Sequence, residues 1–288
     1  LGVAIHPEGA VYAFPNAGSY VGGDITAGII AAGMHEASKP QLLVDVGTNA
    51  EVVIGDAEWM IVGAGAAGPA LEEGIAAIGR RAKSGIVYDV EITDRGVACR
   101  TFDDHAPEGI CGSGMISLLF ELHKAGIIDQ TGAFTRDRRV RESDGERGFP
   151  LACGGGDGLV ITQTEVRNFL RSKAAMFTLL LTLTRSVGVA FRDVERVYVS
   201  GALGTGIDVK KAAGIGMVPS WPAGIVRPLG NTSLAGCRML LEDAHVAATA
   251  DRLVDKITYK HMHDDPEFMK EFRGAVFIPH TEPGLLKV

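Results

Sequence analysis

The sequence is poor in the features that nucleic-acid-binding and membrane-spanning proteins need. Aromatic residues make up only 6% of the 288 residues and the formal net charge is −7, so we expect neither base stacking on single strands nor attraction to a phosphate backbone. The most apolar stretch, residues 174–184, lies between Lys173 and Arg185 and is too short to cross a bilayer. We therefore expect no nucleic-acid partner, no membrane span and a cytoplasmic location.

Cysteine is also scarce. The sequence contains four, at positions that form no CxxC pair: Cys99, Cys111, Cys153 and Cys237. This usage predicts mostly free, buried thiols in a reducing compartment, and no iron–sulfur or zinc site made from these residues alone. His261 and His263 form an HxH pair among charged residues, which we interpret as a solvated helix end and not as a ligand set.

Glycine, in contrast, is abundant. There are 38 glycines, while hydrophobic residues at 46% and charged residues at 22% are typical of a globular protein. Since glycine permits tight turns and close approach of the backbone to a ligand, this excess favours phosphate-binding loops. The chain begins at Leu1 and not at Met, so we expect it to be a piece of a larger protein.

The first 100 residues predict a helix followed by an antiparallel sheet. Residues 24–34 are expected to form a small-residue helix capped by Asp24. Three short apolar runs at 41–46, 51–54 and 59–62 are separated by very short turns. Parallel strands need connections of about a dozen residues, so these runs predict an antiparallel meander.

The rest of the chain predicts alternating strands and helices. Thr162 and Glu165 match a capping box and start a long helix that ends at Gly188. Asp208 and Asn231 are expected to precede a short helix and a last core helix through Leu241. The other predicted elements are a hairpin at 86–92 and 97–101, a helix at 115–125, a strand at 196–200 and a terminal helix at 249–261.

One motif has a carboxylate at the end of a strand. Asp45 is followed by the turn Gly47-Thr48-Asn49. The turn can present N–H groups to phosphate oxygens, and the carboxylate can orient Mg²⁺-bound water. The alternative is an ordinary hairpin turn with an acidic residue at its edge.

Other glycine motifs are less specific. Gly201-Ala202-Leu203-Gly204 follows the buried strand 196–200, where it either lets a ribose or base lie against the backbone or is a plain turn. The run 63–68 matches G-x-G-x-x-G, but its strand belongs to the meander, so we reject a dinucleotide fold and expect a helix start near a nucleotide. Glycines at 109–114 favour close packing over ligand contact, and Cys111 is a weak candidate nucleophile.

The order of these elements predicts an α/β fold. Meander, glycine loop, insertion, long helix, strand and glycine turn occur in the order of a ribonuclease-H-like half of an actin-like ATPase, a mixed sheet flanked by helices with inserted segments. We expect residues 1–40 to end a preceding subdomain, 41–248 to form the ATPase subdomain with an insertion at about 129–160, and 249–288 to form a C-terminal helix and tail.

At this point a family resemblance becomes specific. Between about Phe14 and Leu241, six segments resemble the C-terminal ATPase region of reductive activators of corrinoid proteins, within the acetate/sugar kinase, Hsc70 and actin superfamily. The segments are VGGDITAGIIAAGM, LLVDVGTNAEVVIG, GAAGPALEEG, GICGSGMISLLFELHKAGIID, ITQTEVRNFLRSKAAM and VYVSGALGTGID.

The resemblance implies an activity and a set of site residues. The family uses ATP and Mg²⁺ to drive reduction of cob(II)alamin to cob(I)alamin in a corrinoid protein of a methyltransferase system. The electron comes from a 2Fe–2S cluster, expected only in a part of the protein absent from this chain. The implied residues are Asp45 as catalytic and as Mg²⁺ ligand through water, with Gly47, Thr48, Asn49, Gly65, Gly68, Lys173, Gly201, Ala202 and Gly204 at the nucleotide.

Two departures from the family leave alternatives open. The chain lacks a ferredoxin-like cysteine set and the first Asp-Gly-Thr loop of the family's other ATPase half, so it would hold half of a nucleotide site. One alternative is a small-molecule kinase of the same superfamily, for which we see no catalytic base. The other is a module for docking or homodimerisation that binds no nucleotide.

Overall fold

A six-stranded mixed sheet organises the larger of two lobes. The computed structural model describes residues 4–18, 21–47, 49–65, 76–143, 145–153, 158–201, 206–222 and 224–288. The strands β1 (Gln41–Val46), β2 (Ala50–Gly55) and β3 (Met60–Gly65) form the predicted antiparallel meander. The strand order is β11-β10-β1-β2-β3-β12, with β10 (Arg196–Ser200), β11 (Val226–Gly230) and β12 (Ile257–Tyr259) all in parallel pairs.

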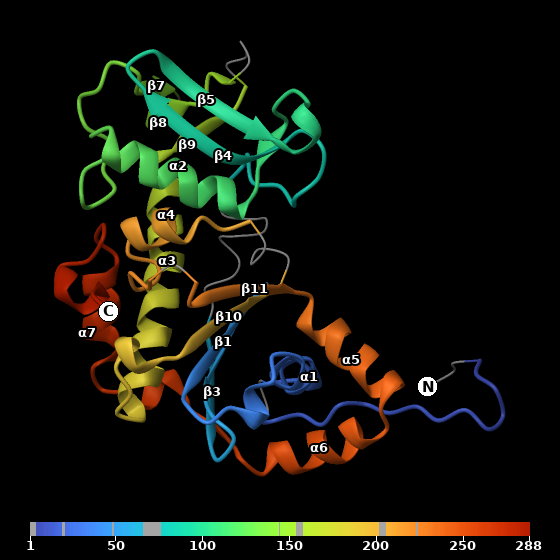
Figure 1. The fold of residues 1–288 in the computed structure, drawn as a ribbon. Helices are drawn as coiled ribbons and strands as arrows, with labels where there is room; N and C mark the ends of the chain where they lie inside the picture. The colour runs from blue at the N-terminus through green and yellow to red at the C-terminus, as the bar shows by residue number, and fades with distance from the viewer. Residues whose placement is uncertain are drawn as a thin grey trace.

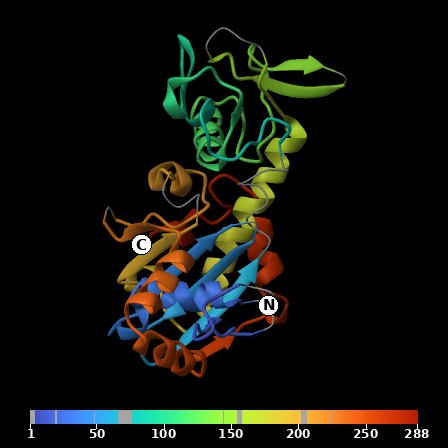
Figure 2. The same cartoon turned by 90° about the vertical axis from the view of Figure 1, so that its right-hand side faces the viewer.

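Helices cover both faces of this sheet (Figures 1 and 2). Because side chains alternate along a strand, Leu42 and Val44 of β1 join one core and Leu43 joins the other. The long helix α3 (Gln163–Ser186) covers the first face, with α7 (Phe268–Ala275) packed against it. The second face carries α1 (Gly23–Ala31), followed by the short helix η1 (Met34–Glu36), together with α5 (Thr232–Glu242) and α6 (His245–Val254).

The second lobe is formed by the middle of the chain and contains two small sheets. One has the order β5-β4-β6 and the other β7-β8-β9. Helix α2 (Gly112–Lys124) packs on β4, and α3 runs from this lobe down into the larger one (Figure 1). The elements are β4 (Ile86–Thr93), β5 (Gly96–Thr101), η2 (Phe102–Asp104), β6 (Gly109–Ile110), β7 (Arg141–Ser143), β8 (Glu146–Pro150) and β9 (Val160–Thr162).

Local sequence signals located most helix starts. Thr162 and Glu165 form both hydrogen bonds of the capping box of α3. Asp208 caps α4 (Val209–Gly214), and Asn231 caps α5. The prediction for α1 is wrong in its cap, because the N-cap is Gly22 and Asp24 lies inside the first turn. The remaining short helices are η4 (Phe191–Asp193), η5 (Met262–Asp264) and η6 (Pro283–Leu286).

Two helix predictions near the C-terminus need correction. The terminal helix expected at 249–261 is wrong, because α6 ends at Val254 and the chain then enters the sheet as β12, where it pairs with β3. The helix expected to be part of the core, α5, buries only Thr232 and Gly236 among its residues. It packs on α1 at Gly236, where a Cβ would lie 2.7 Å from that of Ala27.

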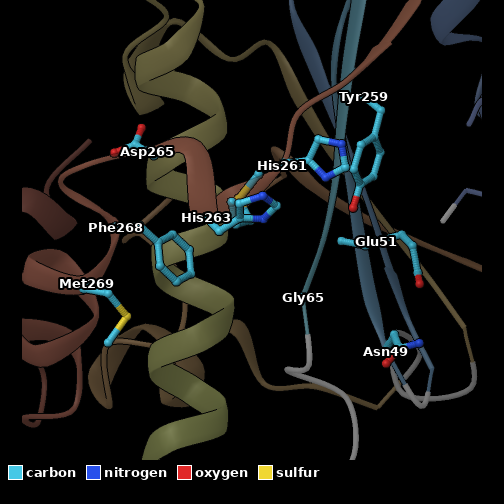
Figure 3. Close-up of a pocket in the computed structure, with 11 residues that line it drawn as sticks. Asn49, Glu51, Gly65, Tyr259, His261, His263, Asp265, Phe268 and Met269 are labelled. Atoms are coloured by element: carbon cyan, nitrogen blue, oxygen red, sulfur yellow. The ribbon is translucent and has the colours of Figure 1, made fainter. Parts of the chain in front are cut away.

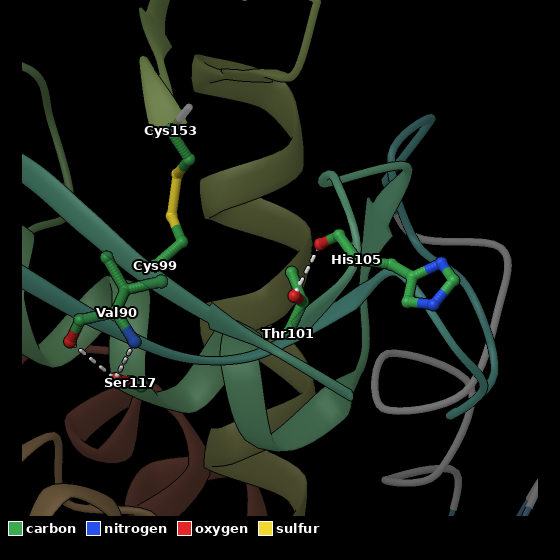
Figure 4. Close-up of a disulfide and its surroundings, with 6 residues drawn as sticks. All are labelled: Val90, Cys99, Thr101, His105, Ser117 and Cys153. Atoms are coloured by element: carbon green, nitrogen blue, oxygen red, sulfur yellow. Dashed lines mark hydrogen bonds between the residues drawn. A yellow bond between two sulfur atoms is a disulfide. The ribbon is translucent and has the colours of Figure 1, made fainter. Parts of the chain in front are cut away.

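A disulfide joins strand β5 to the segment after β8 in the smaller lobe (Figure 4). Cys99 of β5 pairs with Cys153, which follows β8, and their Cα atoms are 5.7 Å apart. The expectation of mostly free thiols is therefore wrong for this pair, while Cys111 is buried and free and Cys237 is exposed and free. In the described part of the chain, no helix is long and apolar enough to span a membrane.

Candidate functional site

The two glycine turns singled out in the sequence lie side by side at one edge of the large sheet. Because β1 and β10 are parallel, their carboxyl ends coincide, and Asp45 is the register partner of Ser200. Gly201 follows with φ of +86°. A Cβ at Gly201 would collide with the carbonyl of Val46 and lie 3.3 Å from Oδ1 of Asp45. Only glycine permits this close approach of the two strand ends.

A row of polar side chains crosses this edge. Asp45 is the register partner of Glu51 on β2 as well as of Ser200, and residues directly opposite one another in a sheet share a face. Burial raises the pKa of Asp45, and the charge of Asp24 adds to that rise. The Ser200 hydroxyl lowers the Asp45 pKa and so offsets part of this rise. This hydroxyl is buried and makes no hydrogen bond of standard geometry with the described residues.

The second carboxylate of the row, that of Glu51, has a pKa close to neutral pH. Burial raises the pKa of Glu51 to about 7, with further contributions from Asp45 and Asp24. Carboxylates that repel one another in this way are stabilised by a nearby cation. Within the described ranges, no three His, Cys, Asp or Glu side chains are placed to hold a metal directly. A Mg²⁺ at this edge would therefore take most of its ligands from phosphate and water, as Mg²⁺ commonly does.

The loop residues of the site are only partly described. Gly47 donates its N–H to the Asn49 carbonyl at 2.9 Å and so closes the turn after β1. Gly65 ends β3 and is the register partner of Ala50, one residue after that turn. The other predicted site residues lie outside the described part of the chain: Thr48, Gly68, Ala202 and Gly204.

A cleft opens beside the turn (Figure 3). Its volume is about 610 Å³, and Asn49, Glu51 and Gly65 form one of its walls. Phe268 and Met269 lie across from them. The cleft thus extends from the carboxylate row toward the surface beside η5 and α7.

The sequence analysis did not place His261 and His263 at a cleft. Both are exposed and His263 lies in the short helix η5, as the interpretation of a solvated helix end expects. However, they follow strand β12 and line the cleft. The ring of His261 lies 4.7 Å from that of Tyr259 and 5.2 Å from that of His263. The spacing of the three rings at every second residue is the period of a strand. That alternation was the sequence signal that could have located them.

Lys173 has a different environment from the one expected. Its side chain is fully buried, and Nζ donates to the carbonyl oxygens of Ala275 at 2.5 Å, Phe277 at 2.6 Å and Pro279 at 2.8 Å. Burial lowers the Lys173 pKa to about 7. An ammonium group has three N–H donors, and here all three bind the C-terminal segment. The structure therefore does not place Lys173 at a base or ribose, and Lys173 has to be removed from the predicted nucleotide site.

The mixed sheet, the inserted lobe and the paired turns at Asp45 and Gly201 define one half of an actin-like ATPase fold. Residues 39–287 match the family described as the C-terminal domain of RACo, the ASKHA domain, and residues 1–37 match the RACo middle region. The chain belongs to this family, which confirms the resemblance and the fold class inferred from its sequence.

Named relatives agree with this assignment. The chain is 29% identical over 282 residues to the corrinoid activation enzyme RamQ of Eubacterium limosum, covering 93% of this chain and 47% of RamQ. It is 28% identical over 269 residues to a Co(II) methylated amine-specific corrinoid protein reductase of Methanosarcina barkeri, covering 84% and 46%. The chain thus spans just under half the length of these relatives.

A solved structure shares the whole fold. The reductive activator for corrinoid, iron-sulfur protein superposes with a TM-score of 0.89 at 37% sequence identity. The match covers 97% of this chain and 46% of the other. The arrangement of both lobes is therefore that of a corrinoid activator's C-terminal region.

Proposed function

We propose that this chain is the nucleotide-binding region of a cytoplasmic protein that reductively activates a corrinoid protein. The observation that carries the proposal is the contact between the Asp45 and Gly201 turns at one edge of the sheet. In the actin-like fold to which the chain belongs, turns at these two positions flank a nucleotide. The names of the relatives supply the corrinoid protein as partner.

The residues of the site have distinct roles in this proposal. The turn from Gly47 to Asn49 binds phosphate oxygens through N–H groups other than that of Gly47, which already donates to the Asn49 carbonyl. The Asp45 carboxylate would hold Mg²⁺ through water, and the ion would supply positive charge to stabilise the phosphate oxygens during hydrolysis. Gly201 lets the ends of β1 and β10 approach each other because it carries no side chain, and the nucleoside binds at the turn that follows it. Bound Mg²⁺ would neutralise phosphate charge and offset the repulsion between Asp45 and Glu51.

The coupled redox step is a one-electron reduction. Cob(II)alamin accepts one electron and becomes cob(I)alamin, and the electron comes from a 2Fe–2S cluster that is oxidised by one electron. The four cysteines of this chain lack ferredoxin spacing and two of them are paired, so we assign the cluster to a part of the protein outside these 288 residues. Nucleotide binding or hydrolysis makes the uphill transfer proceed.

Nucleotide binding is tested by calorimetry with Mg-ATP on the full-length protein that contains this chain, because the chain alone holds half of a nucleotide site. Asp45→Asn is expected to retain binding and to lose ATP turnover, because the amide cannot orient metal-bound water as the carboxylate does. The matched control is Asp255→Asn, an exposed aspartate at the end of α6, which should leave both quantities unchanged. A full-length protein that binds no Mg-ATP would contradict the proposal and favour the docking module.

Corrinoid activation needs a separate experiment. The protein with its electron-donating domain is mixed with a corrinoid protein, and loss of the cob(II)alamin spectrum is followed with and without ATP. We expect reduction only with ATP, and its loss in Asp45→Asn. Equal rates in the two conditions would refute energy coupling, even if the chain binds nucleotide.

A further inference from the structure

The chain segment after Gly201 is held at its far end by the smaller lobe. This segment leads into α4, whose cap Asp208 accepts hydrogen bonds from the N–H groups of Lys210 and Lys211 at 2.8 and 3.2 Å. Helix α4 packs on α2 of the smaller lobe (Figure 1). The segment is therefore attached to the sheet at Gly201 and to the other lobe at α4.

Lys211 makes the polar contact between α4 and that lobe. Its Nζ donates to Asp89 Oδ1 at 2.7 Å, to Ser117 Oγ at 2.7 Å and to the Val90 carbonyl at 3.0 Å. Asp89 and Val90 belong to β4 and Ser117 to α2. Glu121 of α2 lies 3.9 Å away. All three N–H donors of the ammonium are thus used between the two lobes.

This cluster is shielded from water. The side chain of Lys211 is 15% exposed and that of Glu121 3% exposed. Burial by itself raises the pKa of Asp89, but hydrogen bonds from Lys211 and Ser117 and the charge of Lys211 lower it overall. Removing one charge from such a cluster leaves carboxylates without a partner in a weakly solvated place. Breaking this contact is consequently more destabilising than breaking an exposed ion pair.

Two glycines bring the segment close to α2 on either side of Lys211. A Cβ at Gly206 would lie 3.4 Å from Ser113 Oγ, and a Cβ at Gly214 would run into the Phe120 ring. Segment 206–214 therefore lies directly against side chains of α2. The position of α2 constrains this segment, which begins five residues after Gly201.

We propose that Lys211 is a positioning residue for nucleotide binding, acting through α4 on the turn after Gly201. The proposal rests on the function proposed above. By fixing segment 206–214 to β4 and α2, Lys211 couples the orientation of the smaller lobe to the shape of the nucleotide turn. Nucleotide bound at the turn would in return stabilise one orientation of the lobe, because such coupling is reciprocal.

The test compares Mg-ATP binding by calorimetry in four variants of the full chain. Lys211→Met removes the charge and keeps the length of the side chain, whereas Lys211→Arg keeps the charge. Lys210→Met is the matched control, because Lys210 is the exposed neighbour on the same helix. The double variant Asp89→Asn/Lys211→Met removes both charges and serves if Lys211→Met does not fold.

A positioning role makes specific predictions. Lys211→Met is expected to raise the Kd for Mg-ATP about tenfold, within the usual range of coupling between sites. Lys211→Arg should recover most of the affinity, and Lys210→Met should bind like the wild type. In amide hydrogen exchange without nucleotide, residues 206–214 should exchange faster in Lys211→Met than in Lys210→Met.

The outcomes separate this proposal from the proposed function. If folded Lys211→Met, or the double variant in its place, binds Mg-ATP as tightly as the wild type does, the positioning role is refuted and the nucleotide site stands. If Lys211→Arg binds as weakly as Lys211→Met, the effect is loss of packing and the role is likewise refuted. If the wild type binds no Mg-ATP, the proposed function fails and the positioning role fails with it.

Discussion

Gly201 provides a sharp test of the site because two separate penalties meet there. The perturbation is Gly201→Ala, which adds a single methyl group. With φ at +86° the backbone is in a region that side chains rarely adopt, which costs an alanine about 1–2 kcal/mol. The methyl group would also collide with the carbonyl of Val46 and press on the Asp45 carboxylate. Backbone cannot move aside as a flexible side chain can.

The two penalties can be separated with a matched control. Gly188, after α3, has φ of +67° with nothing within 4 Å of an added Cβ, so Gly188→Ala should cost only the backbone term of about 1–2 kcal/mol. Overpacking adds about 1–3 kcal/mol at a tight site. We therefore expect Gly201→Ala to lower the free energy of unfolding by about 2–5 kcal/mol.

Urea denaturation of the two variants measures the difference. Where the folded fraction of Gly201→Ala is high, calorimetry with Mg-ATP should also show weakened binding, because the collision with the Val46 carbonyl displaces the phosphate-binding turn that begins at Gly47. Equal stability of the two variants would show that the strand ends do not meet as described. The reasoning that joins the turns into one site would then be refuted.

Three further predictions concern other parts of the molecule. The pKa of Lys173 is lowered to about 7, so between pH 7 and pH 10 the unfolded state binds one more proton than the folded state. The free energy of unfolding should therefore rise with pH over this range, by up to about 1.4 kcal/mol per pH unit. The Lys173→Met variant should not show this slope. The pKa of Glu51 is raised to about 7, so the stability that this group contributes should fall as pH rises from 4.5 to 7. Denaturation measured over this pH range should show the fall in the wild type and not in Glu51→Gln. Replacing Cys99 and Cys153 by serine should lower the free energy of unfolding by about 2–4 kcal/mol, and dithiothreitol should abolish the difference between this variant and the wild type.

Much of the fold could be predicted because its signals are local. The apolar runs and short turns of β1 to β3 allow only antiparallel pairing, since a parallel connection needs more residues. The capping box at Thr162 and Glu165 marks the start of α3 without reference to any other segment. The order of these elements then specified the fold class, and the glycine turns at Asp45 and Gly201 indicated where a nucleotide would bind.

The failures share a different cause. The strand β12 is three residues long, and the polar residues around it in the sequence resemble a helix end. Its pairing with β3 makes it a strand, and that pairing is not visible in the sequence. The pairing of Cys99 with Cys153 requires strand β5 of one sheet to meet the segment that follows β8 of another. In both cases the stabilising partner is distant in the sequence, so no local pattern identifies it.

The sequence by itself determined the elements, their order and the residue types of the site, because backbone propensity, capping and turn chemistry act over a few residues. Only the tertiary structure decided which of those residues meet. Parallel pairing of β10 with β1 brings Gly201 to Asp45, while packing of the C-terminal segment on α3 surrounds Lys173 with carbonyl groups. The two glycine turns looked no more specific in the sequence than Lys173 did. Contact between residues far apart in the chain is set by sheet register and by burial, which no local pattern records.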